Sequence, residues 1–302
     1  MASALTLGVA GAARADGSPR LGAADVLASR TPPDLTVLDL DVGGDKKIAT
    51  RTTLYIPNHL AKDERVPLLV LFHGLGETWD TGVGVHAWVE RYGLGTAYAR
   101  LRRPPIDHTS RARNLLPDAR LAELNAALAA QPFRGMAIAC PYTPNIARFT
   151  DPEAQLDAYS AWVADVVVPR ARKEAPAILG DAAHTAVDGV SLGGQVSFEV
   201  FTRRPDAFGV LGGVQSAFNR VKLPRYVDRL AATLGKGGKP SVRIVTSESD
   251  PFRETNLALA AMLEQKGVAR DLAVLKGLHD QVFLREVGSL EMLLWHDRRL
   301  RA

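Results

Sequence analysis

Cysteine is almost absent from this chain of 302 residues, which contains only Cys140. A single cysteine excludes an internal disulfide and any cysteine-rich zinc site. No run of 18 apolar residues occurs, so the sequence indicates no transmembrane helix. Charge of one sign is not concentrated either, because 37 basic and 33 acidic residues leave a net charge of +4 that is spread along the chain. We therefore expect no nucleic-acid partner.

Internal repeats and low-complexity linkers are also absent, but residues 1–15 differ from the rest. The small apolar run at 4–13 ends in Ala13-Arg14-Ala15, which resembles the cleavage site of a secretory signal peptide, although no Lys or Arg precedes the run. We expect residues 1–15 to be a signal peptide and residues 16–302 to be a single domain. The protein would then be exported, periplasmic or secreted; a cytoplasmic location is the alternative if the leader is not a signal.

Short apolar segments alternate with helical patterns, which predicts an α/β fold. Residues 35–42 and 48–56 alternate in polarity, as in an antiparallel pair of strands with one face in water. Residues 66–72 form a continuous apolar run, typical of a strand buried on both faces. Further strands are expected at 136–140, 184–188, 210–215, 242–247 and 272–275, with the clearest helices at 151–172, 253–266 and 289–299. We predict a mostly parallel central sheet with antiparallel N-terminal strands and helices on both faces.

The pentapeptide Gly189-Val190-Ser191-Leu192-Gly193 has the G-x-S-x-G pattern of a nucleophile elbow. An apolar strand precedes it and a helical stretch follows it, as the elbow requires. The serine at the tip of such a turn has a strained backbone, and the chain passes too close to positions 189 and 193 for a Cβ atom. Ser191 is therefore the candidate nucleophile; an ordinary turn serine is the alternative.

The sequence His73-Gly74-Leu75-Gly76 directly follows the buried strand at 66–72. In a hydrolase with such an elbow, the loop after this strand supplies one backbone N–H to an oxyanion hole, and the residue after the nucleophile supplies the other. The candidates are the N–H groups of Leu75 and Leu192. His73 itself is expected to be a structural residue of the loop.

The candidate base follows the nucleophile in chain order, after the acid. Only His279 and His296 follow Ser191. His279 lies in a glycine-containing loop after a strand, where a base can reach over the edge of the sheet, so it is preferred. His296 lies inside a helical pattern and is expected to be a surface or packing histidine.

The candidate acid is Asp250, at the end of the strand that begins at 242. Pro251 holds the turn and leaves the carboxylate free to accept from the histidine. Glu248 is the alternative, and Asp188, which precedes the serine, is a weaker rival.

These motifs together resemble the α/β-hydrolase superfamily and, within it, the esterase D-like group. That group includes feruloyl and acetyl-xylan esterases, polyhydroxyalkanoate depolymerases, S-formylglutathione hydrolases and enterobactin esterases. The matching positions are His73-Gly74, the elbow at 189–193, Asp250, and Gly277-x-His279-Asp280, within residues 35–294. One departure concerns the substrate class: the group often has a Trp shortly after the His-Asp pair, whereas this chain continues Gln281-Val282-Phe283.

The resemblance implies a serine esterase that acts through an acyl-enzyme on a small-molecule or carbohydrate-linked ester. Ser191 would be the nucleophile, His279 the base and Asp250 the acid, and no metal or organic cofactor would be needed. A serine peptidase, an acyltransferase and a non-catalytic hydrolase-fold binding protein are the alternatives.

Two features bear on the substrate. The polar segment 101–120 is a candidate for a small lid, with a surface excursion as the alternative. Trp79 is a candidate wall of the substrate pocket, whereas Trp88, at helical spacing from Tyr92, is expected to lie in the core. The sequence indicates neither the ester nor the oligomeric state.

Overall fold

The structure is a computed structural model, and it describes residues 32–109, 113–235 and 240–300. The predicted signal peptide at 1–15 lies outside these residues. Within them, eight strands form one sheet: β1 (Leu35–Asp41), β2 (Arg51–Pro57), β3 (Leu68–Phe72), β4 (Ala137–Pro141), β5 (Thr185–Gly189), β6 (Val210–Val214), β7 (Ser241–Ser249) and β8 (Arg270–Leu278).

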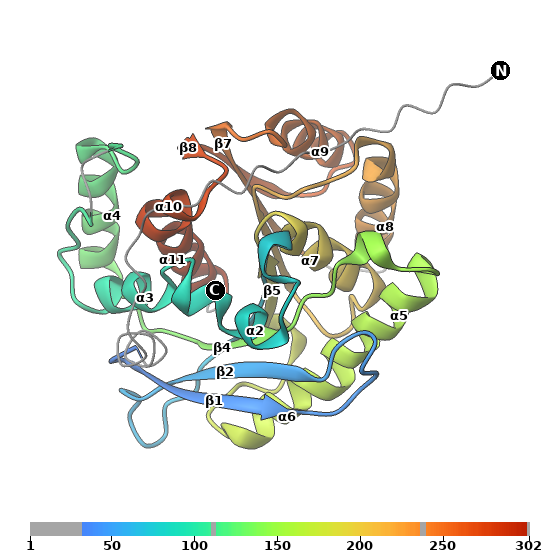
Figure 1. Ribbon diagram of the computed structural model, residues 1–302. Coiled ribbons are helices and arrows are strands. Elements are labelled where there is room, and N and C mark those ends of the chain that lie inside the picture. Colours follow the sequence, from blue (N-terminus) through green and yellow to red (C-terminus); the bar gives the residue numbers. More distant parts are fainter. Residues whose placement is uncertain (1–31, 110–112, 236–239, 301–302) are drawn as a thin grey trace.

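The sheet has the strand order β1-β2-β4-β3-β5-β6-β7-β8. The pairs β1/β2 and β2/β4 are antiparallel, and every later pair is parallel. Figure 1 shows β1 and β2 at one end of the sheet and β7 and β8 at the other. The predicted mostly parallel sheet with antiparallel N-terminal strands is confirmed.

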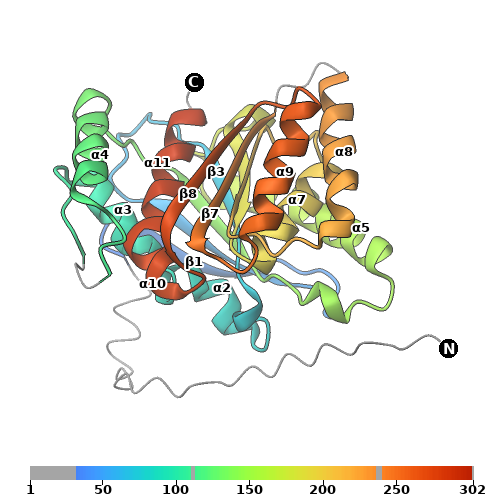
Figure 2. The same cartoon turned by 90° about the horizontal axis from the view of Figure 1, so that it is seen from above.

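Helices cover both faces of the sheet, as Figure 2 shows from above. The α-helices of the described residues are α2 (Thr81–Glu90), α3 (Leu94–Arg102), α4 (Asp118–Ala130), α5 (Pro152–Trp162), α6 (Val168–Glu174), α7 (Leu192–Arg203), α8 (Leu223–Gly235), α9 (Arg253–Gln265), α10 (Gln281–Phe283) and α11 (Ser289–Arg299). One hydrophobic core lies between the sheet and α5–α9, and a second lies under α2–α4 and α11. None of the helices described combines the length and the apolar character that a membrane crossing requires.

The strand β2 corrects one expectation about the N-terminal pair. Polarity alternates along it, yet Thr52, Thr53, Leu54 and Tyr55 are all buried. The reason is that both faces of β2 are covered: Leu54 belongs to one hydrophobic core and Tyr55 to the other. Of the two strands, β1 forms the edge and has the more exposed side chains.

The helix expected at 151–172 is interrupted. Asp151 caps α5 by accepting from the backbone N–H of Ala154, and Pro152 occupies the first turn, as its fixed φ favours. A π-helical segment, Val163–Val167, then joins α5 to α6, and the N–H of Val168 donates to the carbonyl of Val163. Pro169, just beyond, has no N–H to donate, so the regular helical ladder does not continue through this position.

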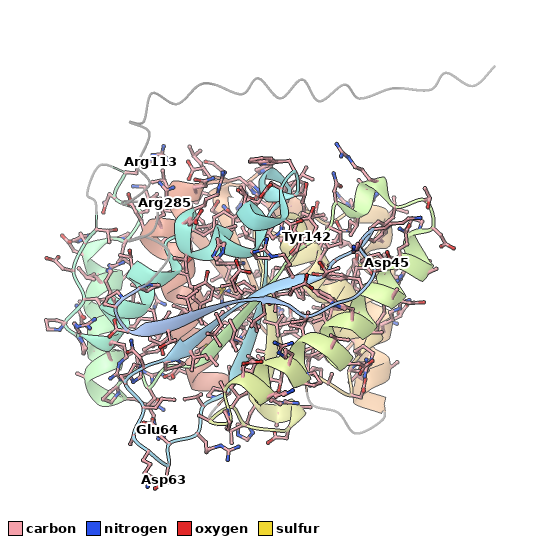
Figure 3. The ribbon with its side chains drawn as sticks, turned by 60° about the horizontal axis from the view of Figure 1, so that its bottom comes forward. Asp45, Asp63, Glu64, Arg113, Tyr142 and Arg285 are labelled. Atoms are coloured by element: carbon pink, nitrogen blue, oxygen red, sulfur yellow. The ribbon has the colours of Figure 1, made fainter. Side chains whose placement is uncertain are left out.

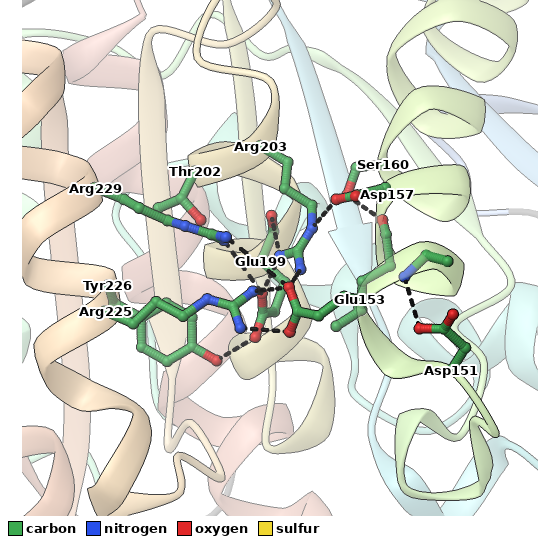
Figure 4. A network of polar contacts seen from close by, with 12 residues as sticks. Asp151, Glu153, Asp157, Ser160, Glu199, Thr202, Arg203, Arg225, Tyr226 and Arg229 are labelled. Carbon is green, nitrogen blue, oxygen red and sulfur yellow. Dashed lines mark hydrogen bonds and ion pairs between the residues drawn. The ribbon is translucent and has the colours of Figure 1, made fainter.

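A network of charged side chains joins α5, α7 and α8 (Figure 4). At its centre is Glu199 of α7, whose side chain is fully buried and contacts Arg203. Glu199 also accepts from the Tyr226 hydroxyl at 2.6 Å and from Arg225 at 3.3 Å. Glu153 of α5 pairs with Arg203 and Arg225 at the exposed side of the network. These contacts hold α7, the helix that begins directly after Ser191, against its neighbours.

Candidate active site

Ser191 lies at the sharp turn between β5 and α7, with φ 57° and ψ −118°. Few non-glycine residues adopt a positive φ, so this turn is strained. A Cβ atom on Gly189 would come within 2.3 Å of the Gly193 carbonyl oxygen, and one on Gly193 within 2.1 Å of the Phe72 carbonyl oxygen. Both flanking glycines are therefore required by the close passage of the chain, as the motif predicts.

The ends of β5, β7 and β8 bring Ser191, Asp250 and His279 into one hydrogen-bonded series. Nδ1 of His279 lies 2.8 Å from Oδ1 of Asp250, and Nε2 lies 3.0 Å from Oγ of Ser191. Because a carboxylate only accepts, Nδ1–H donates to Asp250 and leaves Nε2 to accept the serine proton. The three residues selected from the sequence thus meet with the geometry that a base between an acid and a nucleophile requires.

Asp250 is buried, and each of its carboxylate oxygens accepts a hydrogen bond from the surrounding protein. Oδ2 accepts from the Thr246 hydroxyl at 2.6 Å, and Oδ1 accepts from the backbone N–H of Phe252 at 3.0 Å. The Phe252 ring also packs edge-on against the imidazole of His279, with 5.4 Å between the ring centroids. These contacts fix the carboxylate and the imidazole relative to each other.

The two predicted oxyanion donors flank the serine. Leu192 is the first residue of α7, so its N–H belongs to the helix end that has no carbonyl partner within the helix. Leu75 begins a short 3₁₀-helix, Leu75–Glu77, directly after the strand β3 and the turn at His73-Gly74. The N–H of Gly74 donates to the Tyr92 hydroxyl at 3.1 Å. Gly74 is therefore engaged elsewhere, which favours Leu75 as the donor from this loop.

Tyr92 and Glu77 support the same loop from beneath. The Tyr92 hydroxyl donates to Oε2 of Glu77, whose other oxygen lies 3.6 Å from Arg91. Burial raises the pKa of Tyr92 far above its ordinary value, and the neighbouring Glu77 raises it further. The hydroxyl therefore stays protonated and keeps its place between the Gly74 amide and the Glu77 carboxylate.

His73 has the structural role expected for it. Its Nδ1–H donates to the carbonyl of Gly74 at 2.9 Å, and its Nε2 accepts from the backbone N–H of Thr143 at 2.9 Å. Complete burial lowers the pKa of His73 to about 4. The neutral ring joins the loop after β3 to the segment after β4, and both of its nitrogens are occupied.

A cavity of about 160 Å³ opens beside Ser191 and His279. Glu77, Tyr92, Gln215 and Leu284 are among the residues that line it. The side chain of Trp79, the predicted pocket wall, is 71% exposed and does not line this cavity. A larger hollow of about 830 Å³ lies beside α3 and contains no residue of the elbow or the hydrogen-bonded series in its lining.

The segment 101–120 contacts the site through Arg113. Its ends belong to α3 and α4, and between them Arg113 forms an ion pair with Asp280, the residue after His279. Arg285 donates to Gln281 at 3.0 Å on the same side of the molecule. Figure 3 shows Arg113 and Arg285 on this side, opposite to Asp63 and Glu64. A lid function for the segment stays a prediction.

The rival site residues lie elsewhere. Glu248 is exposed, and the acid that contacts His279 is Asp250. Asp188 is buried beneath the elbow, where Oδ2 lies 2.8 Å from Nε2 of His296. His296 is fully buried, so of the two roles expected for it the packing role is the one it has.

Three residues of the site have no motif of their own in the sequence: Glu77, Tyr92 and Gln215. A carboxylate three residues after the His-Gly pair is a weak signal for Glu77, and Tyr92 shows only the helical spacing of a core residue. Within the residues that the structure describes, no three His, Cys, Asp or Glu side chains are grouped as metal ligands would be.

Comparison with known proteins shows that this chain is similar in fold to several solved structures. No protein-family model and no curated protein sequence matches the chain. Among solved structures, a ferulic acid esterase has a TM-score of 0.62 at 18% identity, over 88% of this chain and 98% of that one. The S-formylglutathione hydrolase of Staphylococcus aureus has a TM-score of 0.59 at 14% identity, over 87% and 98%. The enterobactin esterase of Shigella flexneri has a TM-score of 0.53 at 16% identity, over 89% and 60%. The chain therefore has the α/β-hydrolase fold that these esterases share.

Proposed function

We propose that the protein is a serine esterase that hydrolyses a carboxylic ester through an acyl-enzyme. The observation that carries this proposal is the hydrogen-bonded series from Asp250 through His279 to Ser191, with distances of 2.8 and 3.0 Å. The similarity of fold to solved esterases supports it. The substrate would be a small-molecule or carbohydrate-linked ester, and the predicted signal peptide would direct the protein out of the cytoplasm.

In the acylation step, Nε2 of His279 takes the proton of Ser191 as Oγ attacks the ester carbonyl carbon. The N–H groups of Leu75 and Leu192 donate to the oxyanion of the tetrahedral intermediate, each contributing about 3 kcal/mol in comparable sites. Asp250 holds the imidazole in the tautomer with Nδ1–H and stabilises the imidazolium. Collapse of the intermediate breaks the bond to the alcohol oxygen, which leaves with the proton from His279.

In the deacylation step, water replaces the alcohol. Nε2 of His279 takes one proton of the water molecule while the water oxygen attacks the acyl carbon of the Ser191 ester. The second tetrahedral intermediate then releases the carboxylic acid, and the proton returns from His279 to Oγ of Ser191. The positive end of α7, which begins at Leu192, favours the negative charge formed in both steps.

The proposal is tested with p-nitrophenyl esters from acetate to dodecanoate. We expect Ser191→Ala to lower kcat/KM by about 10³-fold or more, because it removes the nucleophile and leaves only binding and the oxyanion hole. The matched control is Ser197→Ala on the same helix. Ser197 is buried and donates to the carbonyl of Gly212 at 2.6 Å, away from the cavity, so this variant should keep its turnover.

Unchanged turnover in Ser191→Ala would contradict the proposal. If the wild type cleaves none of the esters, labelling by a fluorophosphonate probe decides between the remaining cases. If the probe labels the wild type but not Ser191→Ala, the protein is a serine hydrolase that acts on another acyl substrate. Product analysis with a peptide substrate and with an alcohol acceptor would then distinguish a peptidase from an acyltransferase. Absence of labelling in the folded wild type would indicate a binding protein.

A further inference from the structure

Gln215 occupies a strained and buried position beside the nucleophile. It directly follows β6, its side chain lines the cavity at Ser191, and the residue is 1% exposed. Its φ is +48°, in the left-handed region that non-glycine residues rarely adopt. Ser191 is one of the two other non-glycine residues with positive φ among those described. Such strain persists where the surroundings impose it, and it is concentrated at functional sites.

The backbone around Gln215 is hydrogen-bonded to Ser191 on one side and to β7 on the other. The N–H of Ser191 donates to the carbonyl of Val214 at 3.0 Å, one residue before Gln215. The N–H of Gln215 donates in turn to the carbonyl of Val245 in β7 at 2.6 Å. The left-handed turn at Gln215 thus aims the side chain across the strand ends that carry the acid and the base.

The side-chain amide uses its nitrogen to bridge those two strand ends. Nε2 donates to the carbonyl of Leu278 at 2.9 Å and to Oγ of Ser247 at 2.6 Å. Leu278 directly precedes His279, and the carbonyl of Ser247 accepts from the N–H of Asp250 at 3.2 Å. The amide nitrogen of Gln215 carries two N–H donors, and each of them has a partner here.

The β7/β8 ladder is irregular at this point. Ser247 pairs with Leu275, whereas Ser249 pairs with Leu278, so the register shifts by one residue just before the acid and the base. A ladder that shifts register fixes the separation of two strands less firmly than a regular one. The bridge through Gln215 supplies a restraint where the backbone pairing is disturbed.

We propose that Gln215 is a positioning residue, which holds the His279 loop at the distance from Ser191 and Asp250 that proton transfer needs. This role rests on the proposed serine esterase function. A neutral amide suits the position, because a carboxylate of the same shape would face the Leu278 carbonyl with an acceptor instead of a donor. A thioether of similar length would fill the space but donate to neither partner.

The test is Gln215→Met, assayed with p-nitrophenyl acetate. We expect kcat to fall by about 10- to 100-fold with KM changed by less than about threefold, because small displacements of a catalytic group slow the reaction far more than they weaken binding. The matched control is Ser197→Ala, which also removes a buried hydrogen bond next to β6 and should keep kcat. The thermal unfolding midpoint of both variants is measured in parallel.

A second readout does not depend on the substrate. The His279 Nδ1–H resonance, followed by NMR, should exchange faster with solvent in Gln215→Met than in the wild type. Suppose that Gln215→Met is less stable than the wild type but has the same kcat and the same exchange rate of the His279 Nδ1–H. Gln215 would then be structural only, and the proposal would be overturned. If that variant does not fold, Ser247→Ala removes the tie from Gln215 to β7, and a kcat equal to the wild type would overturn the bridge between the two strand ends.

The two proposals fail in different ways. Absence of both ester hydrolysis and fluorophosphonate labelling in the wild type would refute the serine esterase function. An active wild type with an equally active Gln215→Met variant would refute only the role of Gln215.

Discussion

Two histidines near Ser191 differ in which nitrogen atoms remain free. His73 is buried, and its Nε2 already accepts from the backbone N–H of Thr143. The side chain of His279 is 24% exposed, and its Nε2 faces the Ser191 hydroxyl. Only a ring with an Nε2 lone pair directed at the serine can take its proton. The surroundings of each ring therefore separate the structural histidine from the candidate base.

The buried His73 makes the stability of the protein depend on pH. Its pKa is about 4 in the folded state and 6.5 in the absence of burial, so between these values the unfolded chain binds more protons. The contribution of His73 to stability is therefore complete above pH 6.5 and decreases as the pH falls toward 4. We expect this group alone to lower the free energy of unfolding by about 3 kcal/mol over that range.

Urea unfolding between pH 7 and pH 4 measures this loss, and an NMR titration of the His73 ring assigns it. The ring of the folded protein should remain neutral at pH 5.5. A titration midpoint near pH 6.5 would contradict the prediction. His296 adds to the loss with the same sign, because burial lowers its pKa despite the nearby Asp188.

Among the single residues of the site, the sequence predicts those that belong to a short motif or directly follow a predicted strand. Ser191 is recognised from five consecutive residues, and His279 and Asp250 follow from chain order and strand ends. Gln215 could not be predicted in this way, because its role arises from partners at Ser247 and Leu278 that only the folded sheet brings to it. Tyr92 is similar: its contact with Gly74 arises because the chain that follows α2 returns to the loop after β3.

The helix α7 carries the elbow at its first turn and a buried carboxylate further along. Glu199 is fully buried in the network of Figure 4, with Arg203, Arg225 and Tyr226 as partners. A buried charge of this kind is stabilised by its partners, and its loss removes the one fully buried carboxylate that these partners share. The position of the helix is therefore sensitive to the charge at residue 199.

We expect Glu199→Gln to lower the free energy of unfolding by about 3 kcal/mol, because it removes the buried carboxylate and leaves Arg203 and Arg225 with only exposed acidic partners. The measurement is urea unfolding at pH 7. Glu254→Gln is the matched control: Glu254 is 76% exposed and pairs with Arg253 at 3.2 Å on the surface. That variant should lose less than about 1 kcal/mol. Similar losses in the two variants would show that the buried network contributes little.

Element types were more predictable than their surroundings. The strand β3 is buried along its whole length, as its apolar run predicts, and α11 spans the expected residues, Ser289–Arg299. The expectation that β2 has one face in water was wrong, because the alternation of polarity in the sequence does not show whether a core will form on both sides of the strand. The π-helical segment at Val163–Val167 was also missed, since its cause is a single proline inside an otherwise regular pattern.

Across the whole molecule, the sheet joins the two hydrophobic cores. Neighbouring residues of one strand point to opposite faces, so Leu68 and Val70 belong to one core and Leu69 and Leu71 to the other. Neither core can lose its packing while the sheet stays intact between them. This arrangement predicts that the two layers unfold together.

We expect the loss of far-UV circular dichroism, of tryptophan fluorescence and of ester hydrolysis to coincide during urea unfolding. Trp88 reports on one core and Trp162 on the other, so each layer is followed in a variant that keeps only one of these two tryptophans, with Trp79 and Trp295 replaced by Phe in both variants. Coincident curves are the mark of a single cooperative transition. Separate midpoints for the two variants would show that one layer opens first.

The order of the site residues along the chain also has a consequence for synthesis. The loop at Leu75, the candidate oxyanion donor, is made early, the serine at position 191 later, and the histidine at position 279 close to the end. A ribosome therefore completes most of the sheet before the last strand, β8, can deliver the base. On the proposed mechanism, the nascent chain would be inactive until its final helices emerge. Two inactive fragments divided between the serine and the histidine would then form a complementation pair whose recovered turnover reports their reassociation.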